Sequence, residues 1–322
     1  EVALRFHWNS RVDWIMKTRS EKVIQTNILF PRLAEVYLRV GDISTAWGYL
    51  EKGGDTELHS EIDYRVKEIL KITATEENEL REYYSNGESL WVRGLVVREI
   101  IRKCRESYPP RIGRKKVALV SSSLNRGGAE RQLAYTFRGL DRSRFDCELL
   151  VQRFDNRGNG ETYFDLIDDY ADRAFEISEG TSEERMSSRT RNKINEELFN
   201  LLPNTTIRTV RSLIQHFENE VPDLVHCWQD QTIISASIAS LMCGVPRIMG
   251  SARSMRPDEK SELHIRKRPH LAQCMKFFLS DTRISLTTNS QAGKISYSEW
   301  LGIPPEEISV IHNGVDFEFM EK

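Results

Sequence analysis

Residues 116–131, KVALVSSSLNRGGAER, combine a strand, a glycine turn and the start of a helix. The continuous apolar run Val117–Val120 is typical of a strand covered on both faces, as in a parallel sheet. After the turn, apolar residues recur with the spacing of one helix face, at Ala129, Leu133, Phe137 and Leu140. Gly127 and Gly128 permit another group to approach the backbone closely. The N–H groups exposed at such a helix start attract a phosphate or another anion.

Strand-like and helical segments alternate along the rest of the chain. Further strands are expected at residues 147–151, 174–177, 222–227, 246–250, 284–287 and 308–311. This alternation predicts an α/β fold, with a Rossmann-like, doubly wound parallel sheet. The basic cluster Arg114-Lys115-Lys116, directly before the first strand, is expected to be solvated.

The part before the sheet is expected to be all-helical, which gives a helical domain over residues 1–112 and a Rossmann-like domain over 113–322. The Pro-Pro and Gly of residues 109–113 mark this boundary. Residues 32–50 predict two helices separated by Gly41-Asp42, with spacing that resembles one tetratricopeptide (TPR) pair. Clean further copies are absent, whereas a repeat array needs about three. Additional helical structure is expected over 57–72 and 76–105.

Composition excludes several classes of protein. The 322 residues carry 46 Lys and Arg against 48 Asp and Glu, and this near-neutral balance argues against nucleic-acid binding. Five cysteines without C-x-x-C spacing argue against a zinc site or a disulfide framework, and favour a reducing, cytoplasmic location. The sequence has no apolar run of 18 residues and no visible signal peptide. It begins without Met, and both ends are expected to be fragment boundaries.

Ligands of such sheets bind beyond the carboxyl ends of the strands, so the polar residues that follow the strands are candidates. His226 ends the predicted fourth strand and is either a structural hydrogen-bonding residue or a catalytic one. Arg253 and Arg256 could clamp a phosphate or carboxylate, or one of them could pair with Asp258 or Glu259. Asn313-Gly314 would be a simple turn in isolation.

Four motifs occur in a fixed order, namely GGAE at 127–130, DLVH at 223–226, TNSQAGK at 288–294 and ISVIHNGVD at 308–316. Together they resemble family 4 of the GT-B glycosyltransferases, over about two thirds of the chain. The resemblance implies a hexosyltransferase that moves a sugar, with retention, from a nucleotide sugar to a glycan or lipid-linked acceptor in polysaccharide biosynthesis. On this interpretation His226 is catalytic. Donor phosphate or sugar contacts are expected from Gly127, Gly128, Asn313 and Gly314, and acceptor contacts from Glu130, Arg253 and Arg256.

Two positions depart from the family pattern. His312 replaces the usual proline before Asn313, and Trp228 replaces a second histidine that often follows the first by two positions. Which residue takes over the contact of that histidine with the donor sugar stays open. The resemblance places the donor-binding half in a C-terminal domain that is expected to lie outside this chain, so the fragment is expected to be inactive alone. No metal or other cofactor is expected, because no Asp-x-Asp cluster occurs.

Alternatives remain at this point. The chain could be a helical-repeat interaction module with an inactive Rossmann-like domain, or another nucleotide-dependent Rossmann enzyme. The absence of G-x-G-x-x-G argues against the second of these. Two partner surfaces are possible. The helical domain could bind a protein, and the cluster Arg266, Lys267 and Arg268 is either a solvated face or a peripheral contact with the inner face of a membrane.

Overall fold

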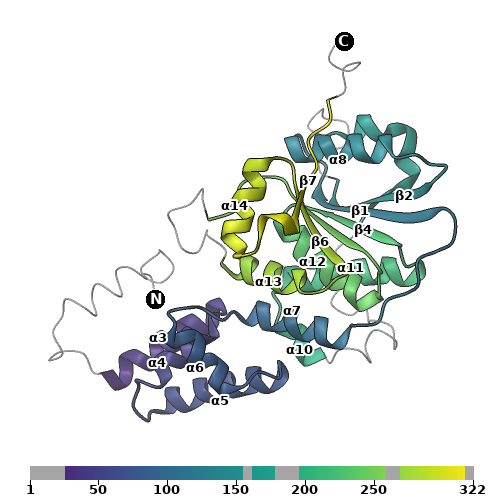
Figure 1. Cartoon of the computed structure of the whole chain (residues 1–322). Helices are drawn as coiled ribbons and strands as arrows, with labels where there is room; N and C mark the ends of the chain where they lie inside the picture. Colours follow the sequence, from purple (N-terminus) through teal and green to yellow (C-terminus); the bar gives the residue numbers. More distant parts are fainter. Residues whose placement is uncertain (1–25, 155–161, 178–195, 259–268, 316–322) are drawn as a thin grey trace. The chain divides into compact units, whose positions relative to one another are not determined.

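The computed structural model describes residues 26–154, 162–177, 196–258 and 269–315 (Figure 1). The chain divides into two compact units, which are described separately. The helical unit comprises Glu1–Glu99, Glu197–Leu202 and Pro257–Cys274. The sheet unit comprises Ile100–Glu196, Pro203–Arg256 and Met275–Lys322. The domain boundary expected at residue 112 stays a prediction.

Within the described residues, the sheet unit contains a seven-stranded parallel sheet in the order β3-β2-β1-β4-β5-β6-β7. Its strands are β1 (Lys115–Ser123), β2 (Phe145–Arg153), β3 (Ala174–Glu176), β4 (Leu224–Trp228), β5 (Ile248–Ala252), β6 (Ile284–Thr288) and β7 (Ile308–Val310). This confirms the predicted Rossmann-like, doubly wound fold. Strand order reverses between β1 and β4, and ligands of open α/β sheets bind at the carboxyl end of such a switch point.

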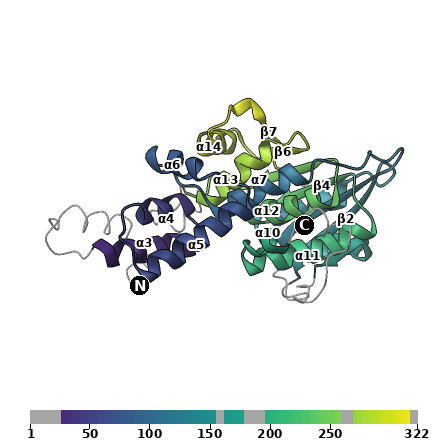
Figure 2. The ribbon, with the colours of Figure 1, turned by 90° about the horizontal axis from the view of Figure 1, so that it is seen from below.

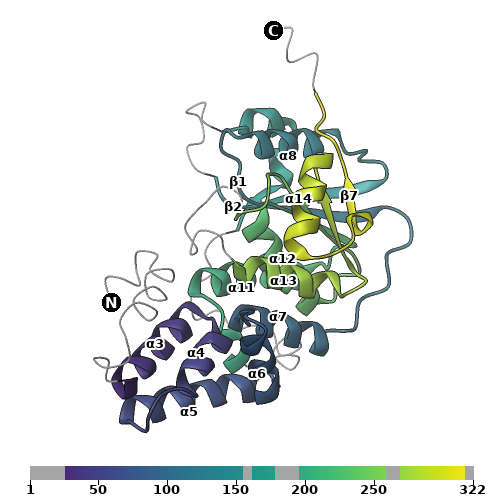
Figure 3. The same cartoon turned by 60° about the vertical axis from the view of Figure 1, so that its left-hand side comes forward.

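Helices cover both faces of the sheet. The helix α8 (Gly128–Gly139) lies on one face, and α11 (Asn204–Asn219) and α12 (Asp230–Cys243) lie side by side on the other, as Figures 1 and 3 show. Figure 2 views the molecule from the side of α11 and α12. Two further helices flank the strands, α14 (Gln291–Leu301) and the 3-10 helix η1 (Phe164–Arg173), and a short 3-10 turn, η2 (Pro305–Glu307), precedes β7.

The face under α8 contains a compact apolar core. The parallel register places Val117 beside Cys147 and Leu119 beside Leu149. These side chains pack with Leu133, Ala134 and Phe137 of α8. The predicted apolar face of this helix is therefore correct at Leu133 and Phe137, which are fully buried. This packing fixes the start of α8, and with it the glycine turn, at the carboxyl edge of the sheet.

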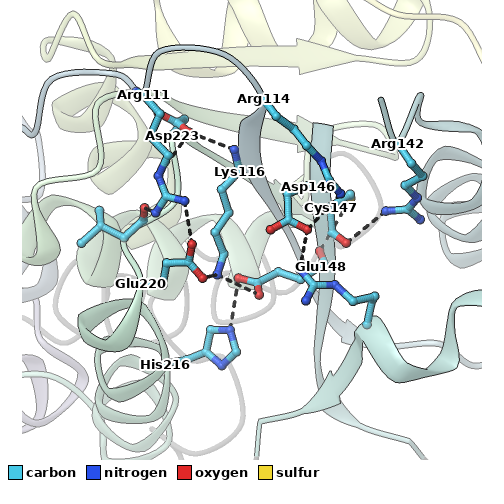
Figure 4. Close-up of polar contacts among 12 residues, drawn as sticks. Arg111, Arg114, Lys116, Arg142, Asp146, Cys147, Glu148, His216, Glu220 and Asp223 are labelled. Carbon is cyan, nitrogen blue, oxygen red and sulfur yellow. Dashed lines mark hydrogen bonds and ion pairs between the residues drawn. The ribbon is translucent and has the colours of Figure 1, made fainter. Parts of the chain in front are cut away.

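The basic cluster before β1 was expected to be solvated, and for Lys116 this expectation is wrong. Lys116 is 5% exposed, and its Nζ lies 3.3 Å from Glu148 Oε2 and 2.8 Å from Glu220 Oε2 (Figure 4). The Nε2 atom of His216 lies 3.1 Å from Glu148 Oε1. Asp223 accepts hydrogen bonds from the backbone N–H groups of Lys116 and Arg111. Successive side chains of a strand point to opposite faces of the sheet. Because Val117 packs under α8, the side chain of its neighbour Lys116 points to the α11 face, where the carboxylates of Glu148 and Glu220 offset its charge.

The helical unit contains α3 (Thr26–Val40), α4 (Ile43–Leu50), α5 (Glu57–Ile72) and α6 (Glu77–Ser85). The predicted break at Gly41-Asp42 is confirmed, because Gly41 has a φ of +92° and Asp42 caps α4 by accepting from Thr45 N. The helical structure expected over 76–105 is interrupted between α6 and α7 (Val92–Lys103). Gly87, with a φ of +72°, reverses the backbone there, which is a conformation that glycine tolerates. The TPR-like character stays a prediction.

We expect Gly48→Val to destabilise the helical unit by about 1–3 kcal/mol, the usual cost of overpacking. A side chain at Gly48 would overlap the ring of Tyr84 on α6. Urea denaturation measures the effect. Gly53→Ala is the matched control, because its new methyl group would lie 3.4 Å from the nearest atoms, an ordinary contact. Equal stability of the two variants would contradict the tight packing of α4 on α6.

Candidate functional site

A cavity of about 510 Å³ lies in the sheet unit, on the α8 side of β1, β4 and β5. Three of the predicted site residues line it, namely His226, Arg253 and Gly314. Its walls are otherwise mostly apolar, with Val117, Leu119, Leu224, Met249 and Ile311 among them. A largely apolar pocket with a few convergent polar groups is the usual form of a small-molecule site.

His226 belongs to a buried hydrogen-bonded chain. Its Nε2 lies 2.7 Å from Ser251 Oγ, which lies 2.7 Å from Thr287 Oγ1. Thr287 in turn donates to the carbonyl of Gly250. With that polarity, Ser251 donates to Thr287, the His226 Nε2–H donates to Ser251, and Nδ1 is left as an acceptor. Burial, and secondarily the charge of Arg253, lower the pKa of His226 to about 3, so the ring is neutral at neutral pH.

Trp228, at the position of the second histidine, packs between two predicted site residues. Its ring centroid lies 5.0 Å from that of His226, and the guanidinium carbon of Arg253 lies 4.5 Å from the Trp228 ring centroid. Arg253 also donates from Nη2 to Asn313 Oδ1 at 2.5 Å. The structure therefore brings together two predicted residues that are 60 positions apart in sequence. The sequence identifies Trp228 as a departure from the family pattern, but it does not predict the contact of Trp228 with Arg253.

The glycine turn at the start of α8 is open at Gly128, whereas the Glu130 carboxylate lies against Gly127. Gly127 is the N-cap and makes no side-chain cap. A Cβ atom placed on Gly128 would have no heavy atom within 4 Å. The space in front of Gly128 is thus not filled by the described protein, as an approach path for an anion requires.

Gln229 is a site residue that the sequence did not reveal. It adopts φ +69° and ψ 149°, a conformation that is rare for any residue other than glycine and costs of order 1–3 kcal/mol. Its side-chain amide accepts from Ser122 Oγ at 3.0 Å and donates to Glu130 Oε1 at 2.7 Å. Its backbone N–H donates to the carbonyl of Ser251. Gln229 therefore ties the end of β1 and the first turn of α8 to β5, and it holds the Glu130 carboxylate.

Arg256 lies apart from this group. Its backbone N–H donates to Ser296 Oγ, and its Nη1 lies 3.7 Å from Glu299 Oε2. The alternative for the loop arginines was pairing with Asp258 or Glu259, and Glu299 is a different acidic residue. Arg253 and Arg256 are thus differently placed, although their sequence context suggested a common role.

A second cavity, of about 460 Å³, opens on the α11 side of the carboxyl edge. Its lining is rich in hydroxyl and amide groups, from Ser122, Ser123, Gln152, Thr209 and Ser212. Gln152 donates to Thr209 across it, at 3.1 Å. Groups of this kind can exchange hydrogen bonds with the hydroxyls of a sugar.

In the part of the chain that the structure describes, no three His, Cys, Asp or Glu side chains gather as metal ligands would. Among the same residues, no helix has the length and apolar character needed to cross a bilayer. The basic cluster at residues 266–268 lies outside the described residues.

Comparisons with known proteins identify relatives of the sheet unit. Residues 126–319, more than half of the chain, match Glycosyltransferase Family 4. The Vi polysaccharide biosynthesis protein VipC/TviE of Salmonella typhi is 24% identical over 118 residues, which are 37% of this chain and 20% of that protein.

Two solved structures are similar at low identity. The lipopolysaccharide outer core galactosyltransferase WaaB in its apo form is 16% identical, with a TM-score of 0.41 over 62% of this chain and 46% of that one. The UDP-GlcNAc 2-epimerase from Neisseria meningitidis bound to UDP-GlcNAc is 12% identical, with a TM-score of 0.40 over 62% of this chain and 47% of that one. The chain spans less than half the length of each of these relatives.

Proposed function

Because the chain belongs to Glycosyltransferase Family 4, we propose that it forms the acceptor-side half of a retaining glycosyltransferase. The reaction would break the bond between the anomeric carbon and the diphosphate of a nucleotide sugar. The oxygen of an acceptor hydroxyl would form the new bond to that carbon, and its proton would pass to the leaving diphosphate. The observation that carries the proposal is the open glycine turn, with Glu130, Arg253 and His226 at the same carboxyl edge of a family-matched sheet.

The donor contacts follow from charge. The leaving diphosphate is anionic, and the backbone N–H groups at Gly127 and Gly128 present the positive end of α8 to it. Asn313 and Gly314 complete this side, and both are held in place. Asn313 accepts from Arg253, while Gly314 exchanges two hydrogen bonds with Gln132, at 2.7 and 2.8 Å. The proposal needs no metal, because these groups would stabilise the leaving charge.

The acceptor side uses the remaining residues. Glu130, oriented by Gln229, would accept a hydrogen bond from an acceptor hydroxyl, and Arg253 would bind the acceptor from the 510 Å³ cavity that it lines. His226 is neutral and would contribute a hydrogen bond through its ring rather than a proton. The hydroxyl-lined second cavity, and the relative named for polysaccharide biosynthesis, support a glycan acceptor.

We expect Gly128→Ala to reduce sugar transfer at least tenfold in the full-length natural protein. The added methyl group would stand in the approach path, and each backbone hydrogen bond to a charged oxygen contributes roughly 1.5–3 kcal/mol. The variant should keep the wild-type fold, because alanine has a higher helix propensity than glycine and its methyl group would contact no described protein atom within 4 Å. Its thermal stability should therefore equal or exceed that of the wild type. Transfer at the wild-type rate by a folded Gly128→Ala variant would reduce the glycine pair to a plain turn.

The alternative is an inactive sheet unit attached to a helical interaction module. It predicts that the wild type itself transfers no sugar, so that Gly128→Ala has no activity to lose. A cytoplasmic location, a protein partner for the helical unit and a membrane contact through Arg266, Lys267 and Arg268 remain proposals from the sequence. Removing those three charges should abolish sedimentation with anionic vesicles at low salt if the membrane contact exists.

A further inference from the structure

Among the residues that the structure describes, the guanidinium of Arg253 has no counter-charge. Within the described residues, no carboxylate lies within ion-pair distance of it, and its Nε is buried without a hydrogen-bond acceptor. Arg253 is partly exposed, and other arginines of the sheet unit have more acceptors. Arg283 pairs with Asp281 at 2.6 Å, and Arg142, whose Nε also lacks an acceptor, donates to two backbone carbonyls. Among the described residues, Arg253 has one acceptor, the neutral amide oxygen of Asn313.

The surroundings of Arg253 hold it in one orientation. The guanidinium carbon lies over the Trp228 ring, 4.5 Å from its centroid, and Asn313 accepts from Nη2. These two contacts hold the guanidinium and leave its Nε without a partner among the described residues. A fork of donors fixed in this way matches the two oxygens of a carboxylate or phosphate.

The cavity beside Arg253 is also unbalanced in charge. No Asp or Glu is among the described residues that line it, and His226 in its wall is neutral. Arg253 is partly buried and its Nε fully so, and a charge withdrawn from water is costly unless it is paired. An arginine without a counter-charge among the described residues, beside apolar walls, is therefore suited to a partner that comes from outside.

We propose that Arg253, held by Trp228 and Asn313, is the binding site for an anionic oxygen group of the substrate, a carboxylate or a phosphate. The acceptor would then be either an acidic saccharide or a saccharide on a phosphate-bearing carrier. This assignment of the acceptor rests on the proposed function, whereas the anion site does not. It also gives Trp228 a role at the position of the missing histidine, because the indole holds the cationic group.

The test is a titration of the protein with glucuronate, glucose and inorganic phosphate, followed by NMR of the Arg side chains at about 0.15 M ionic strength. We expect saturable shifts of the Arg253 signals with at least one anion and none with glucose. Glucuronate that binds more tightly than phosphate would point to an acidic sugar, and the reverse order to a phosphate-bearing carrier. Arg253→Gln should weaken binding roughly tenfold or more, since it removes a charge-assisted contact. Trp228→Leu should weaken it less, because the charge remains.

Arg173→Gln is the matched control, since that arginine is already paired with Asp146 at 2.6 Å and lines neither cavity. It should bind the anions as the wild type does. Arg253→Gln should melt no earlier than the wild type, because an uncompensated charge is removed. Absence of anion binding to the wild type, equal binding by Arg253→Gln, or equal binding of glucose and glucuronate would each overturn the proposal. Because sugar transfer is not measured, failure here is distinct from failure of the proposed function, which the Gly128→Ala assay tests.

Discussion

Lys116→Met should lower the free energy of unfolding by about 3–5 kcal/mol, the usual cost of breaking a buried ion pair from one side. Glu148 is 2% exposed, and among the described residues it would keep the His216 ring as its ion-pair partner only when that ring is protonated. The lost ammonium lies between Glu148 and Glu220 and contacts both carboxylates (Figure 4). Removing it leaves a carboxylate in an apolar sheet interior, which is the costly half of the change.

Urea denaturation of the sheet unit in the full chain measures this effect. Lys115→Met is the matched control, because it makes the same substitution one residue earlier, at a side chain that is not fully buried and forms no described ion pair. The double variant Lys116→Met with Glu148→Leu should recover much of the loss, since no buried charge then remains unpaired. A loss below about 1 kcal/mol for Lys116→Met would show that water or a neighbouring group compensates Glu148.

In the same network, the carboxylate of Glu220 should stay ionised well below the pH at which an ordinary glutamate takes up a proton. Hydrogen bonds from Lys116, and then from Arg111, lower the pKa of this carboxyl to about 2. Its folded-state pKa lies below its ordinary value of 4.5, so its contribution is present above pH 4.5 and is lost as the pH falls toward 2. The Glu220 side chain is half exposed, so solvent screens the pair and the contribution is small beside that of the buried contact.

Much of the fold follows from local pattern. All seven strands were predicted. The interior strands are short apolar runs that are covered on both faces, and the partly exposed edge strands β3 and β7 were placed by the alternation of strands and helices. Lys116 shows the limit of this approach. A lysine beside two other basic residues indicates solvent, and only the pairing of β1 with β2 and the packing of α11 reveal the two carboxylates that surround it.

The site shows the same division. Motifs located the strand ends, and the cavity brings His226, Arg253 and Gly314 together there. Residue type alone suggested one role for Arg253 and Arg256, yet Arg253 stacks on Trp228 whereas Arg256 lies near Glu299. Gln229 could not be recognised from the sequence. Its backbone strain is not visible in the residue type, and its two side-chain partners, Ser122 and Glu130, lie in distant segments of the chain.

His226 should make the stability of the protein depend on pH over a range in which most carboxylates do not yet titrate. Its folded-state pKa is about 3, lowered first by burial and then by the charge of Arg253, against 6.5 for an ordinary histidine. Below pH 6.5 the unfolded chain therefore binds a proton that the folded chain does not bind. Stability must fall as the pH falls, by up to about 1.4 kcal/mol per pH unit. Down to pH 3 the total is on the order of 4 kcal/mol.

His226→Gln isolates this contribution, because the amide nitrogen can still donate to Ser251 while the residue carries no charge at any pH. Unfolding free energies of the wild type and the variant, measured between pH 7 and pH 4.5, should converge as the pH falls or cross in favour of the variant. His216→Gln is the control for an imidazole in the sheet unit that lies outside the cavity, since it pairs with Glu148 instead. Parallel curves for the wild type and His226→Gln would mean that the buried ring takes up a proton in the folded state. In that case His226 could serve as an acid in the proposed transfer, and its assignment as a neutral hydrogen-bonding contact would be wrong.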